Sequence, residues 1–594
     1  MTNKNITTFA TTDSTIKLAQ SEFEKLLSST GLADLKAEFN RHENEGYSLL
    51  HKDGVLNFSA PSAVEVLYAV YDFAETFLGY CFFEPGVDLR SDVNSKIPTG
   101  ILFDQKCPKI KRRGFIQEFP FNEDSFLLAD WMVKNRLNYI MTWMKYYDLI
   151  SDDLKEYFAV RGIEIESGHH NFSYWIPTSE YGEKNPEFFA MKDGVRIKPS
   201  EDKNALLLSE QLCTTNPELR AEMAKKMIAY TKAHPEIKTL SIAPNDGFGW
   251  CECPECSNFY DTDDMGEFYC VSEHTYRAGR IYHEMYEDVS KQFHAVCPDV
   301  DVTFMAYVNY SRPSPDFRLE DGEIVHFAPY WRCINHSIAD EACPINKYYK
   351  RDILEWCAAR DGGEINIYEY FMGVNFYLSL PMIHHEMMFD EIDFYQQHQI
   401  EGLLTQFHLP HWGVYGINYY AMAQAGYGTD KQHFLTKTFN ALFGKHAAQY
   451  QDFYGLLRTL QESAGKCLLP YQRHLFGRTE IEQFKKLAKL AAALPQDIPY
   501  PLMCERLKIW AQYLLKFKEL SDAANAKVLT VEDLDQFLAW CHSQSGKGVI
   551  VLSRLDTYFT ALSDCLKSGK EWIHFNIDWE DDHIKRVGQF LGDL

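Results

Sequence analysis

The sequence predicts an α/β protein: a (β/α)8 TIM-like barrel, preceded by a small α/β domain and followed by a helical C-terminal domain. Three observations support this prediction. The chain has 594 residues, which corresponds to roughly four domains of about 150 residues each, or to fewer if one of them is a large barrel. In its middle part, eight strand-like segments alternate with helix-like segments over roughly 300 residues, the length of a barrel with insertions. The strand signal then fades, and long segments with a helical period follow.

The composition is that of a globular protein with an excess of acidic groups. Hydrophobic residues make up 46% and charged residues 24% of the chain, which excludes a disordered or collagen-like protein. Lys plus Arg number 59 against 84 Asp plus Glu, a net charge of -25, which repels nucleic acid and anionic membranes. Aromatic residues reach 14%, an excess that a sugar-binding cleft would use. We therefore expect a carbohydrate substrate, no nucleic acid and no membrane.

Compartment and thiol state follow from two further patterns. The N-terminus lacks the apolar core of a signal peptide, and no apolar run approaches the roughly 20 residues that span a bilayer. We therefore expect a cytoplasmic protein. The 15 cysteines are an odd number scattered over a large chain, which favours reduced thiols over a disulfide framework. A homo-oligomer remains an open alternative to a monomer.

Residues 1–106 predict the small α/β domain. Thr15-Ile16-Lys17 is expected as a short strand before a helix over residues 18–28, and residues 54–58 are expected as a strand after a turn. A second helix over residues 60–78 opens with Ser59 as its cap and stops at Gly79.

The barrel is expected over residues 107–428. Its strands are predicted at residues 113–119, 139–143, 162–167, 239–243, 300–307, 323–328, 364–370 and 402–407. Most of the intervening segments are amphipathic helices with start signals such as Ser151 and Asn216. A doubly wound open sheet is the structural alternative, but the chain lacks the Gly-rich phosphate fingerprint that would support it.

Residues 429–594 predict the helical C-terminal domain. Helical periodicity runs over residues 431–443, 447–464, 480–493 and 504–523. Since neither a low-complexity linker nor a repeat of fixed period separates the three parts, we expect them to pack together rigidly.

In a barrel of this kind the active site lies where the strands end, so polar residues there are the catalytic candidates. The fourth strand runs into Pro244-Asn245-Asp246-Gly247. The Asp246 carboxyl could protonate a leaving group or orient a substrate amide, and Asn245 could donate and accept a hydrogen bond in the same step. The alternative is an Asx turn that only caps the strand.

Two more strand ends carry titratable groups. Glu369 ends the seventh strand between two tyrosines, whose apolar rings could raise its pKa. The alternative is a carboxylate paired with an Arg or Lys that the sequence does not identify. His169 and His170 follow the third strand, and we expect them to donate hydrogen bonds to hydroxyls, because no second pair at i, i+4 completes a zinc signature. Metal ligands or ordinary surface residues are the alternatives.

Aromatic and polar side chains at the strand ends complete the predicted site. Five tryptophans favour a stacking cleft for sugar rings, although strand-end aromatics also pack loops onto barrels: Trp143, Trp175, Trp250, Trp331 and Trp412. Seven polar side chains in comparable positions could bind hydroxyls: Gln117, Glu118, Lys145, Arg332, His336, Gln406 and His408.

Cys251, Cys253 and Cys256 form a C-x-C-x-x-C run. Such a run can wrap a structural zinc, with Cys270 or His274 as the fourth ligand, whereas a turn of reduced, packed thiols is the alternative. Because thiolates would fill the coordination shell, this metal would be structural, and no cofactor is expected to take part in catalysis.

Several stretches resemble a known family. SIAPNDGFGWCECPEC at residues 241–256 resembles the signature of domain of unknown function 4838, part of which is classed as glycoside hydrolase family 163. LYAVYDFAETFLGYCFFEPG at residues 67–86 is similar to the N-terminal domain that precedes the barrel in α-glucuronidases and β-hexosaminidases. Weaker similarities follow at residues 161–170, at residues 367–381, and at Cys333 with His336 and Cys343.

The resemblance implies a retaining endo-β-N-acetylglucosaminidase that cuts N-glycans, with the substrate's own acetamide as nucleophile. It implies that Asn245 and Asp246 position the acetamide or protonate the glycosidic oxygen, and that Glu369 is the second acid or base. Gln406 departs from the family pattern, which has an acidic residue there, and Arg332 ends a segment where a Glu is expected. A catalytically inactive carbohydrate-binding relative is therefore the alternative, and a metal-dependent hydrolase comes third.

Overall fold

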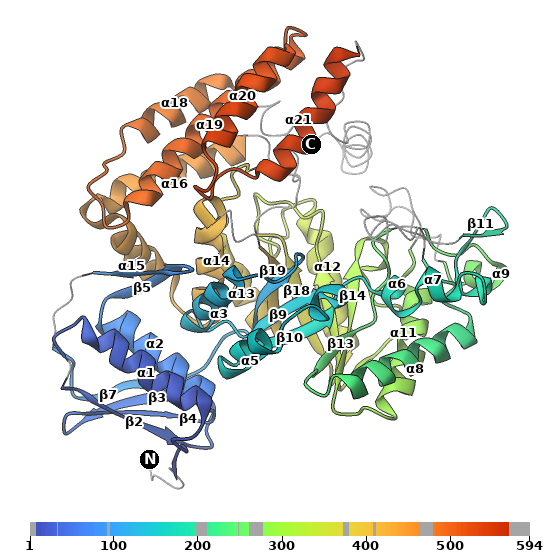
Figure 1. Ribbon diagram of the computed structural model, residues 1–594, viewed down its shortest axis with the longest axis horizontal. Helices are drawn as coiled ribbons and strands as arrows, with labels where there is room; N and C mark the ends of the chain where they lie inside the picture. Colours follow the sequence, from blue (N-terminus) through green and yellow to red (C-terminus); the bar gives the residue numbers. More distant parts are fainter. Residues whose placement is uncertain are drawn as a thin grey trace.

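The computed structural model describes residues 7–568, except residue 33, residues 92–95, 198–210, residue 248, and residues 261–276, 372–378, 408–411 and 464–478. A small sheet domain, a closed barrel and a group of helices follow one another along the chain (Figure 1). The predicted fold class is thus confirmed. Among the helices of the described residues, none combines the length and the apolar character that a bilayer crossing needs.

The N-terminal domain is a five-stranded sheet with two helices on one face (Figure 1). Its strands lie in the order β1 (Thr7–Thr8), β2 (Lys36–Arg41), β4 (Val55–Ala60), β3 (Tyr47–Lys52) and β7 (Gly100–Lys106). Helices α1 (Ser14–Ser28) and α2 (Ala63–Phe77) pack against each other and against this sheet. Phe23 of α1 meets Phe58 of β4 edge to face, with ring centroids 5.8 Å apart, so aromatic side chains fill the space between the layers.

Two predicted boundaries in this domain are wrong, and capping explains both. Residues 15–17 belong to α1 rather than to a strand, because the Asp13 carboxylate accepts hydrogen bonds from two backbone N–H groups of the first turn, at 2.8 and 3.1 Å. Helix α2 is capped by Ser62 rather than Ser59, because Ser59 still pairs within the sheet. A side chain that satisfies the first free N–H groups decides where a helix begins.

Eight parallel strands close the barrel, and the last pairs with the first. In ring order they are β8 (Arg112–Gln117), β9 (Tyr139–Trp143), β10 (Glu164–Gly168), β13 (Thr239–Ser241), β14 (Asp301–Tyr307), β16 (Glu323–Ala328), β18 (Glu364–Glu369) and β19 (Gly402–Gln406). Each of the eight predicted segments overlaps one of these strands. Gly114 permits the close approach of β8 to β9, because a Cβ there would lie 1.7 Å from the carbonyl oxygen of Tyr139. The closed ring excludes the open-sheet alternative.

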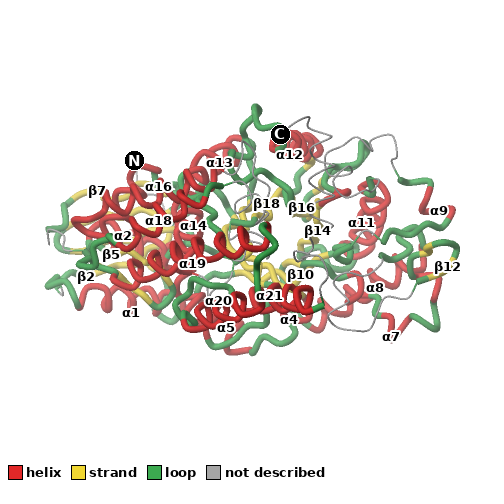
Figure 2. Tube along the Cα trace, turned by 90° about the horizontal axis from the view of Figure 1, so that it is seen from above, coloured by secondary structure: helices red, strands yellow, loops and turns green. Residues whose placement is uncertain are grey.

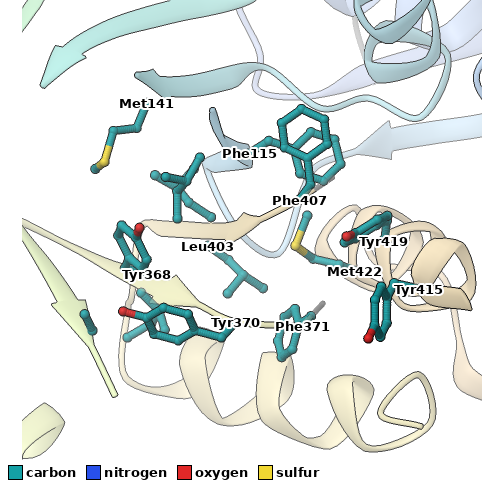
Figure 3. Packing of buried hydrophobic residues seen from close by; sticks show 14 of the residues in the cluster. Phe115, Met141, Tyr368, Tyr370, Phe371, Leu403, Phe407, Tyr415, Tyr419 and Met422 are labelled. Atoms are coloured by element: carbon teal, nitrogen blue, oxygen red, sulfur yellow. The ribbon is translucent and has the colours of Figure 1, made fainter. Parts of the chain in front are cut away.

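Helices surround the ring of strands (Figure 2). They are α3 (Asp124–Lys134), α5 (Asp152–Val160), α8 (Pro217–Ala233), α11 (Gly279–His294), α12 (Asn346–Ala359), α13 (Met387–Gln397) and α14 (Trp412–Gly426). Ser151 and Asn216 cap α5 and α8, as predicted. Phe115 of β8 packs on Phe407, with ring centroids 4.5 Å apart, next to side chains of α14 (Figure 3). Buried aromatic contacts thus fix the helix layer to the barrel.

The C-terminal part consists of helices that pack on both other parts. They are α15 (Lys431–Phe443), α16 (Ala447–Ser463), α18 (Ile481–Ala492), α19 (Pro501–Asn525), α20 (Val531–Ser543) and α21 (Leu552–Lys567). One hydrophobic core continues from the barrel into these helices, whereas the N-terminal domain has a core of its own. Arg506 of α19 donates hydrogen bonds to both oxygens of Glu84 in β5 (Tyr80–Glu84), at 2.5 and 2.9 Å.

Candidate active site

A cavity of about 190 Å³ lies at the carboxyl ends of the barrel strands. Residues at or just beyond the ends of seven strands line it: Glu118, His169, His170, Asp246, Met305, Tyr307, Tyr330, Tyr368, Tyr370 and Gln406. This is the edge at which barrel enzymes place their active sites. Five predicted site residues are among them, namely Glu118, His169, His170, Asp246 and Gln406.

Asp246 lies at the mouth of the cavity, on the loop that follows β13. Its side chain is 39% exposed, and its Oδ1 atom is 3.8 Å from Nε2 of His170. Burial raises the pKa of Asp246 to about 6. His169 lowers this pKa, and the negative charge of Glu118 raises it further. A carboxyl group with a pKa near neutrality can hold a proton and deliver it to a leaving group.

Glu118 is the second carboxylate of the cavity, and three neighbours hold it in place. Gln406 Nε2 and the Tyr368 hydroxyl donate hydrogen bonds to its Oε1 atom, at 2.7 and 3.2 Å. Nε2 of His169 is 3.4 Å from the same oxygen. Gln406, at the end of β19, therefore holds a carboxylate that directly follows β8.

From its sequence position, Glu118 is predicted only as a hydroxyl-binding residue. The signal for a larger role was present, because Glu118 is a carboxylate that directly follows the first barrel strand, β8. The four cavity tyrosines were also missed as a group. They replace the expected tryptophans as the aromatic walls of the cavity.

The two histidines have different surroundings. The ring of His169 stacks on Trp143 with centroids 4.2 Å apart, and its backbone φ of 65° lies in the left-handed region, which is uncommon outside glycine. Nδ1 of His170 lies 2.5 Å from the Pro244 carbonyl oxygen. Burial and the neighbouring His169 lower the pKa of His170 to about 3. His170 is therefore neutral at pH 7, and donation from Nδ1 leaves Nε2 as an acceptor that faces Asp246.

Asn245 positions the loop of Asp246 and does not itself line the cavity. Its Oδ1 atom accepts hydrogen bonds of 3.0 Å from both the backbone N–H and the hydroxyl of Ser173. Gln211 Nε2 donates to the carbonyl oxygens of Asn245 and Gly247, at 2.6 and 2.9 Å. Asn245 therefore holds the loop in place through a segment distant in the chain, while Asp246 lines the cavity.

Glu369 lies outside the cavity, contrary to the expectation. It is fully buried and forms an ion pair with Arg332, which also pairs with Glu391 of α13. Burial raises the pKa of Glu369, although Arg332 opposes the shift. Side chains alternate along a strand, so Tyr368 and Tyr370 line the cavity while the residue between them faces the helix layer. Glu369 is therefore a carboxylate paired with an arginine, which was the alternative to a catalytic role. Arg332, predicted to bind substrate, is held by Glu369 and Glu391 and does not line the cavity.

None of the five predicted stacking tryptophans lines the cavity, but two contact residues that do. The ring of Trp143 stacks on His169, and that of Trp331 lies edge to face with Tyr330, with centroids 4.4 Å apart. Four of the five are deeply buried and pack loops and helices onto the barrel: Trp175, Trp250, Trp331 and Trp412. Nε1 of Trp175 donates to the Ser241 carbonyl oxygen at 3.2 Å, and Nε1 of Trp412 to that of Phe83 at 3.0 Å. His408 lies outside the described residues.

The chain, a closed eight-stranded barrel with a cavity at the carboxyl ends of its strands, belongs to the family described as domain of unknown function (DUF4838). The model of this family matches residues 95–455, which is more than half of the chain. The predicted family resemblance is therefore confirmed. The search of curated proteins found no match.

Solved structures with a similar fold include glycoside hydrolases. A GH138 enzyme targeting pectin rhamnogalacturonan II is 8% identical, with 98% of each chain covered and a TM-score of 0.50. A GH115 4-O-methyl-α-glucuronidase with specificity for decorated arabinogalactans is 9% identical, with 98% of this chain and 80% of that chain covered and a TM-score of 0.52. A GH89 enzyme from Clostridium perfringens, in complex with its substrate GlcNAc-α-1,4-galactose, is 10% identical, with coverage of 97% and 78% and a TM-score of 0.51. At such identities the likeness shows the fold alone.

Proposed function

We propose that this protein is a glycoside hydrolase that cleaves a glycan or glycoconjugate, with Asp246 as the general acid and Glu118 as the second carboxylate. The observation that carries the proposal is that both groups line one cavity with different surroundings. The pKa of Asp246 is raised to about 6, whereas Glu118 accepts hydrogen bonds from Gln406 and Tyr368. Different environments for two carboxyl groups separate the roles of acid and base in glycosidases.

In this mechanism, protonated Asp246 gives its proton to the glycosidic oxygen while the bond from that oxygen to the anomeric carbon breaks. His170 beside it is neutral, so no positive charge at this position lowers the pKa of the acid. Glu118 faces the same cavity and stabilises the positive charge that develops on the sugar ring. The oxygen of a water molecule then forms a bond to the anomeric carbon, and the proton that this water loses returns to the carboxylate of Asp246.

The finer proposal is that the sugar in this cavity is an N-acetylhexosamine and that its acetamide oxygen attacks the anomeric carbon, as in an endo-β-N-acetylglucosaminidase. Its support is the family resemblance of residues 241–256 and the GlcNAc-containing substrate of the GH89 fold neighbour. Glu118 would then accept the acetamide N–H and orient the nucleophile. The cavity of about 190 Å³ is smaller than the about 300 to 1,000 Å³ of drug-sized pockets, which suits one sugar ring.

A panel of aryl glycosides and free N-glycans tests both the proposed hydrolase activity and the proposed N-acetylhexosamine specificity. Release of product from at least one substrate supports the hydrolase, and inhibition by a hexosamine thiazoline supports the role of the acetamide. The second candidate is an inactive carbohydrate-binding relative, favoured by Gln406 at the end of the eighth strand. Binding on a glycan array without release of any product would favour that candidate and reject the hydrolase.

A further inference from the structure

Four cysteines form a cluster apart from the cavity. Cys213, Cys251, Cys253 and Cys256 are buried free thiols, and their sulfur atoms all lie within 4.8 Å of one another. Sγ of Cys213 is 3.7 Å from that of Cys253 and 3.9 Å from that of Cys256. Sulfur atoms in a disulfide are about 2.04 Å apart, so these thiols are gathered together without being bonded.

We propose that this cluster binds one zinc ion as a structural site with four thiolate ligands. Zn–S bonds are about 2.3 Å long, and sulfur atoms at the corners of a tetrahedron of that radius are about 3.8 Å apart. The observed separations of 3.7 and 3.9 Å match the edges of this tetrahedron. Because four thiolates complete the shell, no position remains open for a water molecule, and the metal is structural.

The atoms around the cluster suit thiolates. The backbone N–H of Met191 and the guanidinium of Arg196 donate hydrogen bonds to Sγ of Cys251, at 3.3 and 3.4 Å. The hydroxyl of Thr215 lies 3.2 Å from Sγ of Cys256. Zn²⁺ with four thiolates carries an excess negative charge, which the guanidinium and the N–H and O–H donors offset. Partners of this kind orient the ligands of a metal site.

The fourth ligand comes from a distant part of the chain. The predicted fourth ligands, Cys270 and His274, lie outside the described residues, whereas Cys213 lies 40 residues before Cys253. The backbone N–H of Gln211 donates to the Gly249 carbonyl oxygen at 2.9 Å, which brings the two segments side by side. The cluster lies where α9 (Pro254–Ser257) meets the hairpin of β11 (Met191–Lys192) and β12 (Val195–Arg196), at the end of the molecule opposite the N-terminal sheet (Figures 1 and 2).

The proposed zinc would also secure the loop of Asp246 from both sides. Gln211, which holds the backbone of Asn245 and Gly247, stands two residues before Cys213. On the other side, Cys251 follows Asp246 by five residues. The metal would therefore link the segment of Gln211 and Cys213 to the loop of Asp246. Removal of the metal should make the backbone of residues 245–247 more mobile.

Metal analysis and X-ray absorption of the full chain test the site, after purification under reducing conditions and reconstitution with Zn²⁺ alone. We expect a zinc ion with four sulfur ligands at about 2.3 Å. Cys213→Ser should lose one zinc per chain, whereas Cys504→Ser, at a buried cysteine outside the cluster, should keep it. His336→Gln is a second control, because Cys333, His336 and Cys343 form another group of possible ligands, with two sulfurs and a nitrogen.

The proposal fails if the wild-type chain binds no zinc after reconstitution, or if its only zinc has a nitrogen ligand and is lost in His336→Gln. A second measurement needs no variant, in case Cys213→Ser does not fold. Alkylation of the four cysteines, mapped by mass spectrometry, should speed up at least tenfold when a chelator removes the metal, and hydrogen exchange at residues 245–247 should rise. Equal rates with and without the chelator, or disulfides among the four, would overturn the site. Neither measurement uses a glycoside, so the outcome is independent of the proposed activity.

Discussion

Asp246 and Glu118 face one cavity from different strands: Glu118 directly follows β8, and Asp246 lies on the loop after β13. Burial and, to a smaller extent, the charge of Glu118 raise the pKa of Asp246, while His169 opposes them. The two carboxyl groups are therefore electrostatically linked. This link makes the protonation of Asp246 sensitive to changes at Glu118, which gives the proposed mechanism a measurable signature.

Asp246→Asn should lower kcat by about 10²-fold to 10⁴-fold, because an amide cannot deliver the proton that a general acid supplies. The melting temperature should not fall, since the substitution removes a carboxyl whose ionisation burial opposes. Steady-state kinetics and thermal denaturation measure both effects. Asp316→Asn, at an exposed aspartate outside the cavity, is the matched control and should change neither. Full turnover in Asp246→Asn would remove this residue from the mechanism.

The pH dependence of kcat/KM should show a fall in activity as the pH rises through about 6. The acid works in its protonated form, and that form is lost above the pKa of Asp246, which is about 6. Glu118→Gln should lower the rate and also move the midpoint of this fall to lower pH, because it removes a negative charge that helps to raise the pKa. A midpoint that stays in place or moves to higher pH would contradict the assignment.

Glu369→Gln should affect stability first. Removal of one partner of a buried ion pair costs about 3–5 kcal/mol, and the lower end is expected here because Glu391 still pairs with Arg332. Urea denaturation measures the loss. Glu386→Gln, at a glutamate that is 65% exposed beside α13, should be neutral within about 0.5 kcal/mol. If Glu369→Gln is as stable as wild type but has lost turnover, Glu369 takes part in the chemistry after all.

Asn245→Ala should destabilise the protein by about 1–3 kcal/mol, because it leaves two donors of Ser173 without their acceptor. It should also lower kcat more than it changes KM, since a displaced Asp246 affects proton transfer more than binding. A double-mutant cycle with Ser173→Ala measures the link, and we expect the two effects to be non-additive. Simple additivity would show that Asn245 does not act through Ser173.

Much of the fold could be predicted from the sequence because its signals are local. The eight strand segments, and the helix starts at Ser151 and Asn216, depend on periodicity and capping within a few residues. The wrong boundaries in the N-terminal domain lie at two helix starts, where the caps Asp13 and Ser62 decide the first helical residue. Asp246, His169, His170 and Gln406 followed from the rule that barrel sites lie at strand ends.

The sequence by itself thus determined which elements form and at which end of them a site lies. The tertiary structure alone decided which side chains face the cavity. A parallel strand in a closed barrel is buried on both faces, so its residues lack the alternation that would reveal its inner face. Successive side chains of a strand point to opposite faces, and the register of the strand in the barrel decides which set faces the cavity. In β18 this register places Tyr368 and Tyr370 on the cavity and Glu369 on the opposite face. Partners far apart in the chain, such as Arg332 for Glu369 and Cys213 for Cys253, likewise meet only when the fold brings them together.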